Sequence, residues 1–164
     1  MLEIKTYIKK KGIIKNNDNL DEFFILVNTS EVFKFVEDFC YMEGALEIIW
    51  NNELIIGLKQ WDLIDQLWIY LIDAIGEILN GKKEISFWFP DQPIEVKIFD
   101  FLNGNVMLTI DNKKIYEEKN YLFRELLNAA SSFFIKMIYT DNTFPNELKG
   151  KVLGDIGMYL DKVK

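Results

Sequence analysis

The feature that most constrains the fold is a regular alternation of apolar and polar residues between residues 85 and 116. Alternate side chains on a β-strand point to opposite faces, so this period of two predicts strands with two distinct faces. Turn signals separate the strands: Phe89–Pro93, then Asn103-Gly104, which we expect to form a type I′ turn, then Asp111-Asn112. We therefore expect an antiparallel meander. Its strands are predicted at 85–89, 94–98, 106–110 and 114–116.

A helical period is clearest over residues 60–80, and Gly81 closes the segment. The apolar side chains cover a broad arc, which predicts a helix buried between a sheet and other helices. Acidic side chains gather on the opposite, narrower face. They are Asp62, Asp65, Asp73 and Glu77.

The remaining elements follow from weaker patterns. Residues 2–15 predict one or two strands, and residues 22–28 a buried strand. Ser30 is a good N-cap for a helix that should run to about Met42 and bury Cys40. The other predicted elements are a hairpin of 45–50 and 53–58 around Asn51-Asn52, a long helix over 118–139, and a final helix after Phe144-Pro145.

Together these elements predict an α+β fold. We expect a single domain over residues 1–164, since the length suits one core and no Pro, Gly or Ser-rich linker divides the chain. Its architecture should be a mostly antiparallel sheet of about six to eight strands packed with three or four helices.

Histidine is absent from the chain, which also has one cysteine and one arginine. Histidine is the commonest general acid or base and metal ligand, so Ser-His, Cys-His and the usual zinc chemistry are unavailable. The sequence also lacks a Gly-rich phosphate loop and an EF-hand loop. We therefore expect a protein that is not an enzyme and has no cofactor or metal. An enzyme that uses two carboxylates remains an alternative, because that chemistry needs no histidine.

The net charge of −7 is unevenly distributed. Residues 21–100 contain five lysines against sixteen acids, a net charge of −11. This disfavours nucleic acid as a partner, because phosphate contacts need a basic surface. It favours attraction of a basic protein, with Asp62, Asp65, Asp73 and Glu77 as candidate partner-binding residues. The alternative is a face that is merely solvated.

Targeting signals are not evident. The first residues lack the apolar region of a signal peptide, and charges interrupt every apolar stretch before it reaches membrane-spanning length. A lone cysteine cannot form an intramolecular disulfide. We therefore expect a cytoplasmic protein that does not insert in a membrane.

Trp88 is a further candidate partner-binding residue. Its neighbours Phe87 and Phe89 should point to the opposite face of the strand, so both faces of the sheet are apolar there. Either helices cover both faces, or one face is a protein-binding patch. The second case leaves open an adaptor that self-assembles through an aromatic sheet face, for example as a homodimer.

The segment 60–110 resembles the immunity proteins of bacterial polymorphic toxin systems. The resemblance is carried by Trp61, Leu67-Trp68 and Leu71, then by Phe89-Pro90-Asp91-Gln92-Pro93 and an alternating strand. Proteins of that class are cytoplasmic and bind a cognate toxin domain, often covering its active site. The resemblance therefore implies a non-catalytic inhibitor whose partner is a toxin domain, and the acidic middle of the chain indicates that this domain is basic.

Overall fold

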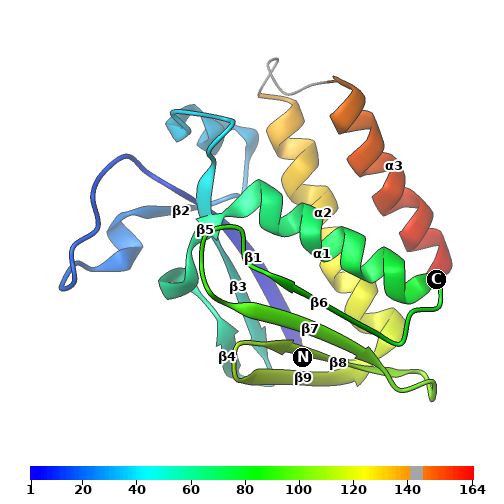
Figure 1. Ribbon diagram of the computed structural model, residues 1–164. Coiled ribbons are helices and arrows are strands. Elements are labelled where there is room, and N and C mark those ends of the chain that lie inside the picture. Colours follow the sequence, from blue (N-terminus) through cyan, green and yellow to red (C-terminus); the bar gives the residue numbers. More distant parts are fainter. Residues whose placement is uncertain (141–145) are drawn as a thin grey trace.

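The computed structural model describes residues 1–140 and 146–164, and the strands in this part of the chain form two antiparallel sheets (Figure 1). They are β1 Leu2–Lys9, β2 Phe24–Leu26, β3 Glu43–Trp50, β4 Glu53–Ile56, β5 Asp62–Leu63, β6 Glu84–Trp88, β7 Glu95–Asp100, β8 Asn105–Ile110 and β9 Lys113–Glu118. The first sheet has the order β2-β1-β3-β4, and β5 pairs with the start of β3. The second sheet has the order β6-β7-β8-β9.

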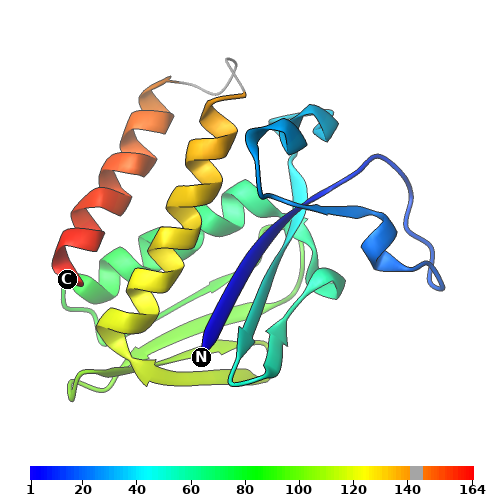
Figure 2. The same ribbon diagram turned by 180° about the vertical axis from the view of Figure 1, so that it is seen from behind.

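Three α-helices pack against these sheets: α1 Ile64–Leu79, α2 Lys119–Ile138 and α3 Asn146–Lys162. Helix α1 lies along one face of the second sheet, α2 packs against β1, and α3 packs on the outside of α1 and α2 (Figures 1 and 2). Three short 3-10 helices lie within the first half of the chain: η1 Leu20–Glu22, η2 Ser30–Phe35 and η3 Leu58–Gln60. None of the helices in the described residues is long and apolar enough to cross a membrane.

A single hydrophobic core joins both sheets and all three α-helices. Trp68 of α1 is its largest fully buried side chain, and its indole N–H donates to the Thr6 hydroxyl of β1 at 3.2 Å. Burial of this large ring therefore leaves no unpaired donor. This hydrogen bond fixes α1 against the first sheet. Other residues of α1 pack on the second sheet.

The predicted α+β class and the antiparallel meander are confirmed. The described residues form nine strands. Helix α1 lies between β5 and β6 in the chain, and the five strands before it and the four strands after it form separate sheets. The predicted hairpin at Asn51-Asn52 is also confirmed, with φ values of 50° and 66° that match a type I′ turn. The turn between β7 and β8 is longer than predicted, with positive φ at Leu102 and Gly104 rather than at Asn103.

The helix predicted from Ser30 to Met42 is wrong. The 3-10 helix η2 ends at Phe35, and Val36 is already extended with ψ of 121°. The Asp38 side chain then accepts the Cys40 backbone N–H at 2.8 Å, a local turn that competes with helix formation. Cys40 is consequently exposed instead of buried.

Two other boundaries differ from the sequence prediction. The strand predicted over 22–28 is the short edge strand β2, and Leu26 within it is exposed. The strand region predicted over 2–15 ends at Lys9. The predicted helix start after Phe144-Pro145 lies outside the described residues, although α3 itself is present.

Candidate functional site

The four acidic residues predicted to share one helix face are separated in the structure. Asp62 lies in β5 and is 3% exposed, and Asp65 lies in the first turn of α1 and is 7% exposed. Asp73 is exposed and Glu77 is partly exposed on α1. The prediction of a common exposed stripe is therefore wrong for Asp62 and Asp65. The reason is that pairing of β5 with β3 keeps residues 62–63 extended, so that the helix begins only at Ile64.

Asp62 connects β5 to the turn between β6 and β7. Its carboxylate accepts the backbone N–H groups of Leu63, Asp91 and Gln92 at 2.6 to 3.1 Å. The Gln92 side chain returns a hydrogen bond to the Trp61 carbonyl at 2.8 Å. The buried carboxylate thus satisfies backbone donors that would otherwise be unpaired, and it fixes the turn of the second sheet beside the first.

A hollow of about 210 Å³ opens next to this turn. Its lining residues come from three separate parts of the chain and are Tyr41, Glu43, Trp61, Asp62, Leu63, Asp91 and Gln92. The Tyr41 hydroxyl donates to Asp91 Oδ2 at 2.7 Å, and this hydrogen bond raises the pKa of Tyr41 above its usual value. Tyr41 nevertheless remains 53% exposed, so much of its ring faces solvent at the rim of the hollow.

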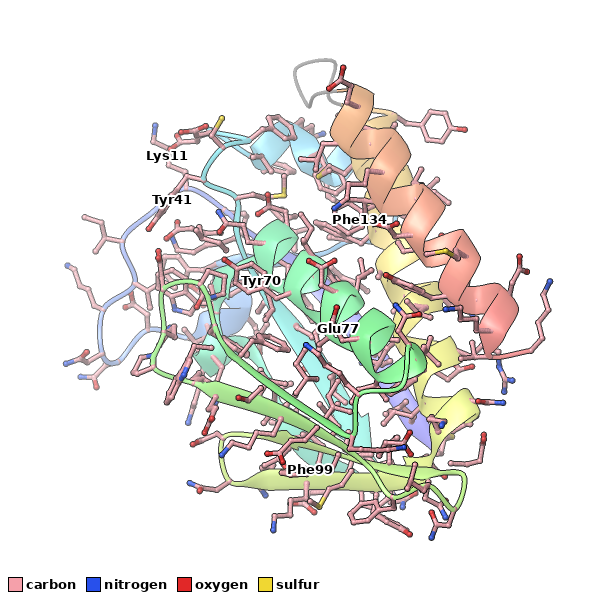
Figure 3. All side chains as sticks on the ribbon, turned by 45° about the vertical axis from the view of Figure 1, so that its right-hand side comes forward. Lys11, Tyr41, Tyr70, Glu77, Phe99 and Phe134 are labelled. Atoms are coloured by element: carbon pink, nitrogen blue, oxygen red, sulfur yellow. The ribbon has the colours of Figure 1, made fainter. Side chains whose placement is uncertain are left out.

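A larger hollow of about 450 Å³ adjoins the first and shares Tyr41 and Glu43 with it. We call the two together the Tyr41 groove. The larger part is lined by the end of β1, the loop after it and the segment after η2. Figure 3 shows Lys11 and Tyr41 on this side of the molecule. Its lining residues are Lys9, Lys10, Lys11, Gly12, Ile13, Phe35, Val36, Glu37, Asp38, Tyr41 and Glu43.

Lys9 shows how the Tyr41 groove holds a cation. Its ammonium lies 2.8 Å from Glu43 Oε2 and 5.1 Å from the centre of the Trp61 ring. It also donates to the Gly12 carbonyl at 3.2 Å. A carboxylate and the face of an indole ring are complementary to a positive charge, and the groove presents both together.

Acidic side chains continue along the same face of β3. Glu47 lies four residues after Glu43 and accepts from Lys5 and Tyr7 of the neighbouring strand. The hydrogen bonds that Lys5 donates to Glu3 and Glu47 raise the pKa of Lys5 to about 12. A third hollow, of about 460 Å³, is lined by Glu47 together with Asp18, Asp21 and residues 57–60. Glu43 and Glu47 thus lie on one face of β3, and each forms an ion pair with a lysine of β1.

The groove's carboxylates already have partners. Both oxygens of Asp62 accept backbone N–H groups, Asp91 accepts from Tyr41, and Glu43 pairs with Lys9. No group of three or more Asp, Glu or Cys side chains that could hold a metal ion is found within the described part of the chain. Within the groove, Glu43 and the Trp61 ring hold the Lys9 ammonium by an ion pair and a ring contact.

Trp88 lies at the end of β6 and is 56% exposed. On the other face of the strand, Phe87 contacts Tyr70 of α1, with ring centres 6.0 Å apart. Helix α1 therefore covers one face of the second sheet, and the face that carries Trp88 is open. Phe101 and Tyr116 are exposed near the opposite edge of this sheet and contact each other.

The sequence did not identify Tyr41 or Glu43 as site residues. Tyr41 was expected at the end of a helix, and nothing in its local pattern places it beside a turn fifty residues later. The Phe89–Pro93 turn was recognisable, because its two prolines interrupt the alternation. Its docking onto β5 depends on the tertiary contact of Asp62.

Comparison with known proteins gives no match to a protein family, to a curated protein or to a solved structure.

Proposed function

We propose that the chain is a non-catalytic protein-binding protein, and that it holds a basic segment of its partner in the Tyr41 groove. The observation that carries the proposal is the arrangement of Tyr41, Glu43, Trp61 and Asp91 around one hollow. Exposed aromatic rings beside charged groups are typical of the energetically dominant residues of protein interfaces. Lys9 already occupies one edge of this arrangement with the geometry that a partner's lysine or arginine would adopt.

The remaining groove surface also suits a protein partner. Ile13 is 85% exposed and Phe35 is 42% exposed, so apolar contacts are available beside the charged ones. Lys11 and Glu37 form an exposed ion pair at the rim. Such a pair contributes little to stability but can select partners by charge. The combined hollows are therefore lined by both apolar and charged side chains.

The particular partner that we propose is a bacterial toxin domain, with this chain as its immunity-type inhibitor in the cytoplasm. The resemblance of residues 60–110 and the net charge of −11 over residues 21–100 support this version. A basic toxin would be attracted over a distance by the acidic middle of the chain. The groove would then fix the orientation of the toxin by holding one of the toxin's lysine or arginine side chains.

The test is a calorimetric titration of the full chain against the toxin domains encoded beside its gene. We expect a specific complex that is weakened at least about tenfold by Tyr41→Ala or Asp91→Asn, because each removes a central contact. Asp161→Asn is the matched control, since Asp161 is an exposed acid far from the groove in sequence and pairs only locally with Lys164. Failure of every neighbouring toxin domain to bind would contradict the immunity role. Binding that is unchanged by both groove variants would contradict the proposal that the Tyr41 groove is the binding site.

Self-assembly through the second sheet is a second candidate function. The exposure of Trp88, Phe101 and Tyr116 on the part of the second sheet that α1 does not cover favours it. Sedimentation at several concentrations distinguishes this candidate, because a stable dimer that Trp88→Ser dissociates would support it.

A further inference from the structure

Strand β1 extends beyond its short partner β2, and a hollow lies beside the uncovered part. Pairing with β2 covers only Tyr7–Lys9 of β1, after which the Val27 N–H donates to the Thr6 carbonyl at 2.8 Å. Helix α2 (yellow to orange) runs beside β1 (dark blue) in Figure 2. The hollow has a volume of about 180 Å³, and we call it the Lys136 hollow. It is lined by residues 4–6 and 26–28 and by Ala129, Ser132, Phe133 and Lys136 of α2.

Lys136 gives this hollow a positive charge that no acid neutralises. Its ammonium donates to Ser132 Oγ at 2.7 Å and lies 3.5 Å from the Val27 carbonyl. Lys136 forms no ion pair among the described residues. An ammonium has three N–H donors, so at least one remains available to a ligand. The Ser132 hydroxyl accepts from Lys136, so its own hydrogen also remains available.

Main-chain N–H groups of β1 add further donors. The Thr6 carbonyl accepts from Val27, so the backbone groups of Thr6 face β2 rather than β3. Because this direction alternates along an antiparallel strand, Ile4 faces the same edge. Neither the Ile4 N–H nor the Thr6 N–H has a hydrogen-bond partner among the described residues. Thr6 is only 8% exposed, and a shielded N–H without an acceptor is unfavourable, so an acceptor oxygen in the hollow would be stabilising.

The charge of the Lys136 hollow distinguishes it from its neighbours. Its described lining includes no acidic side chain, whereas the Tyr41 groove and the hollow beside Glu47 are both lined by several acids. Lys5 also lines the Lys136 hollow, but its ammonium pairs with Glu3 and Glu47 on the other face of β1. The hollow therefore favours an anion, although the net charge of the whole chain is −7.

We propose that the Lys136 hollow binds the carboxylate of a ligand that also carries a short aliphatic group. One carboxylate oxygen would accept from Lys136 and Ser132, and the other would accept from the Thr6 N–H. One ammonium matches the single charge of a carboxylate, whereas a phosphate group carries about −1.5 to −2 charges at pH 7. The aliphatic group would contact the apolar part of the lining. This part comprises Ile4, Leu26, Val27, Ala129 and Phe133.

A free carboxylic acid and the C-terminus of a peptide both present this chemistry. The probes are therefore isovalerate and acetyl-valyl-valine, each titrated into the full chain labelled with nitrogen-15. We expect a saturable shift of the Thr6 amide proton to higher frequency, because the carboxylate accepts a hydrogen bond from it. Acetyl-valyl-valine amide and inorganic phosphate should bind at least about tenfold more weakly. Tighter binding of the peptide than of isovalerate identifies a C-terminus as the ligand, and equal binding identifies a free acid.

Lys136→Gln is the decisive variant. Glutamine is also a good helix former and keeps a donor near Ser132, but it removes the positive charge. We expect at least about tenfold weaker binding of isovalerate, as for the loss of a charge-assisted hydrogen bond. Arg124→Gln is the matched control, because it makes the same change of charge on the same helix, about 18 Å away. The control should leave binding unchanged.

Several results would overturn the inference. One is a Thr6 amide that no carboxylate shifts in the folded wild type. Another is equal binding by the free and the amidated peptide, a comparison that needs no substitution. Equal weakening by Lys136→Gln and Arg124→Gln would show general attraction of anions, and tighter binding of phosphate would assign the hollow to another anion.

This inference does not depend on the Tyr41 groove, because the two sites share no lining residue. The Tyr41→Ala variant should bind isovalerate as the wild type does, which separates this result from the groove experiment.

Discussion

At the scale of single residues, Asp62 and Asp65 show that two neighbouring buried acids can have opposite energetic roles. Asp62 accepts backbone donors from two parts of the chain and so stabilises their arrangement. Asp65 has a buried Oδ1 atom with no hydrogen-bond partner among the described residues. Burial raises the pKa of Asp65 to about 6, and backbone N–H groups offset this only in part.

Asp65→Asn should therefore stabilise the protein at neutral pH. The pKa of Asp65 is higher in the folded state than the ordinary value of 3.8, so the folded state binds more protons between pH 3.8 and about 6. The free energy of unfolding consequently falls as pH rises through this window. The loss from this one group is at most about 3 kcal/mol, at about 1.4 kcal/mol per pKa unit. The Asp65→Asn variant has no carboxyl group at this position, so its free energy of unfolding does not fall for this reason.

Urea unfolding of both proteins at several pH values from 4 to 7 measures the difference. We expect the Asn variant to gain stability relative to the wild type steadily from pH 4 to pH 7. Subtracting the wild-type free energy of unfolding from that of the variant at each pH removes the contributions of other groups. One such group is Asp73, whose pKa is also raised by burial. A stability difference that is constant over this pH range would contradict the account of Asp65.

At the scale of elements, helix α1 determines the architecture because it contacts both sheets and α3. At Gly76, helix α1 packs against Tyr159 of α3. A Cβ atom at this position would lie 2.3 Å from the Tyr159 ring, and Tyr159 is only 9% exposed. Glycine is therefore required here for packing, although it lowers helix propensity by about 1 kcal/mol relative to alanine.

Gly76→Ala should destabilise the protein by about 1 to 3 kcal/mol, the usual cost of an overpacked core position. Gly154→Ala is the matched control on α3, since nothing lies within 4 Å of a Cβ at that position. The control should instead stabilise by up to about 1 kcal/mol. Thermal unfolding of the three proteins tests the pair. Equal effects of the two substitutions would show that Gly76 has no packing role.

The sequence predicted the elements whose conformation depends mainly on nearby residues. Alternation identified β6 to β9, and Asn51-Asn52 identified the first hairpin, because a pleated strand and a type I′ turn each depend on nearby residues. The segment after Ser30 was mispredicted because the Asp38 turn interrupts an apparent helical period. The absence of histidine, and with it of Ser-His and Cys-His catalytic groups, can be read from the sequence alone.

The site could not be predicted from the sequence, for a physical reason. Tyr41, Trp61 and Asp91 are brought together by the hydrogen bonds of Asp62 to a turn nearly thirty residues away. No local period encodes such a contact. The concentration of acids in residues 21–100 was visible in the sequence, but the ion pairs of Glu43 and Glu47 with lysines of β1 became clear only with the pairing of β1 and β3.

At the scale of the whole molecule, the chain presents two surfaces with different recognition chemistry. The Tyr41 groove offers carboxylates and aromatic rings for a cationic side chain. The Lys136 hollow offers an ammonium and main-chain N–H groups for a carboxylate.

The most direct test of the central claim is a map of amide chemical-shift changes on the full chain in complex with the toxin domain that we propose as its partner. The account predicts the largest changes at Tyr41, Glu43, Trp61 and Asp91, with at least about tenfold weaker binding by the Asp91→Asn variant. Changes confined to other surfaces, such as α3 or the loop between β7 and β8, would contradict the assignment of the Tyr41 groove as the partner-binding site.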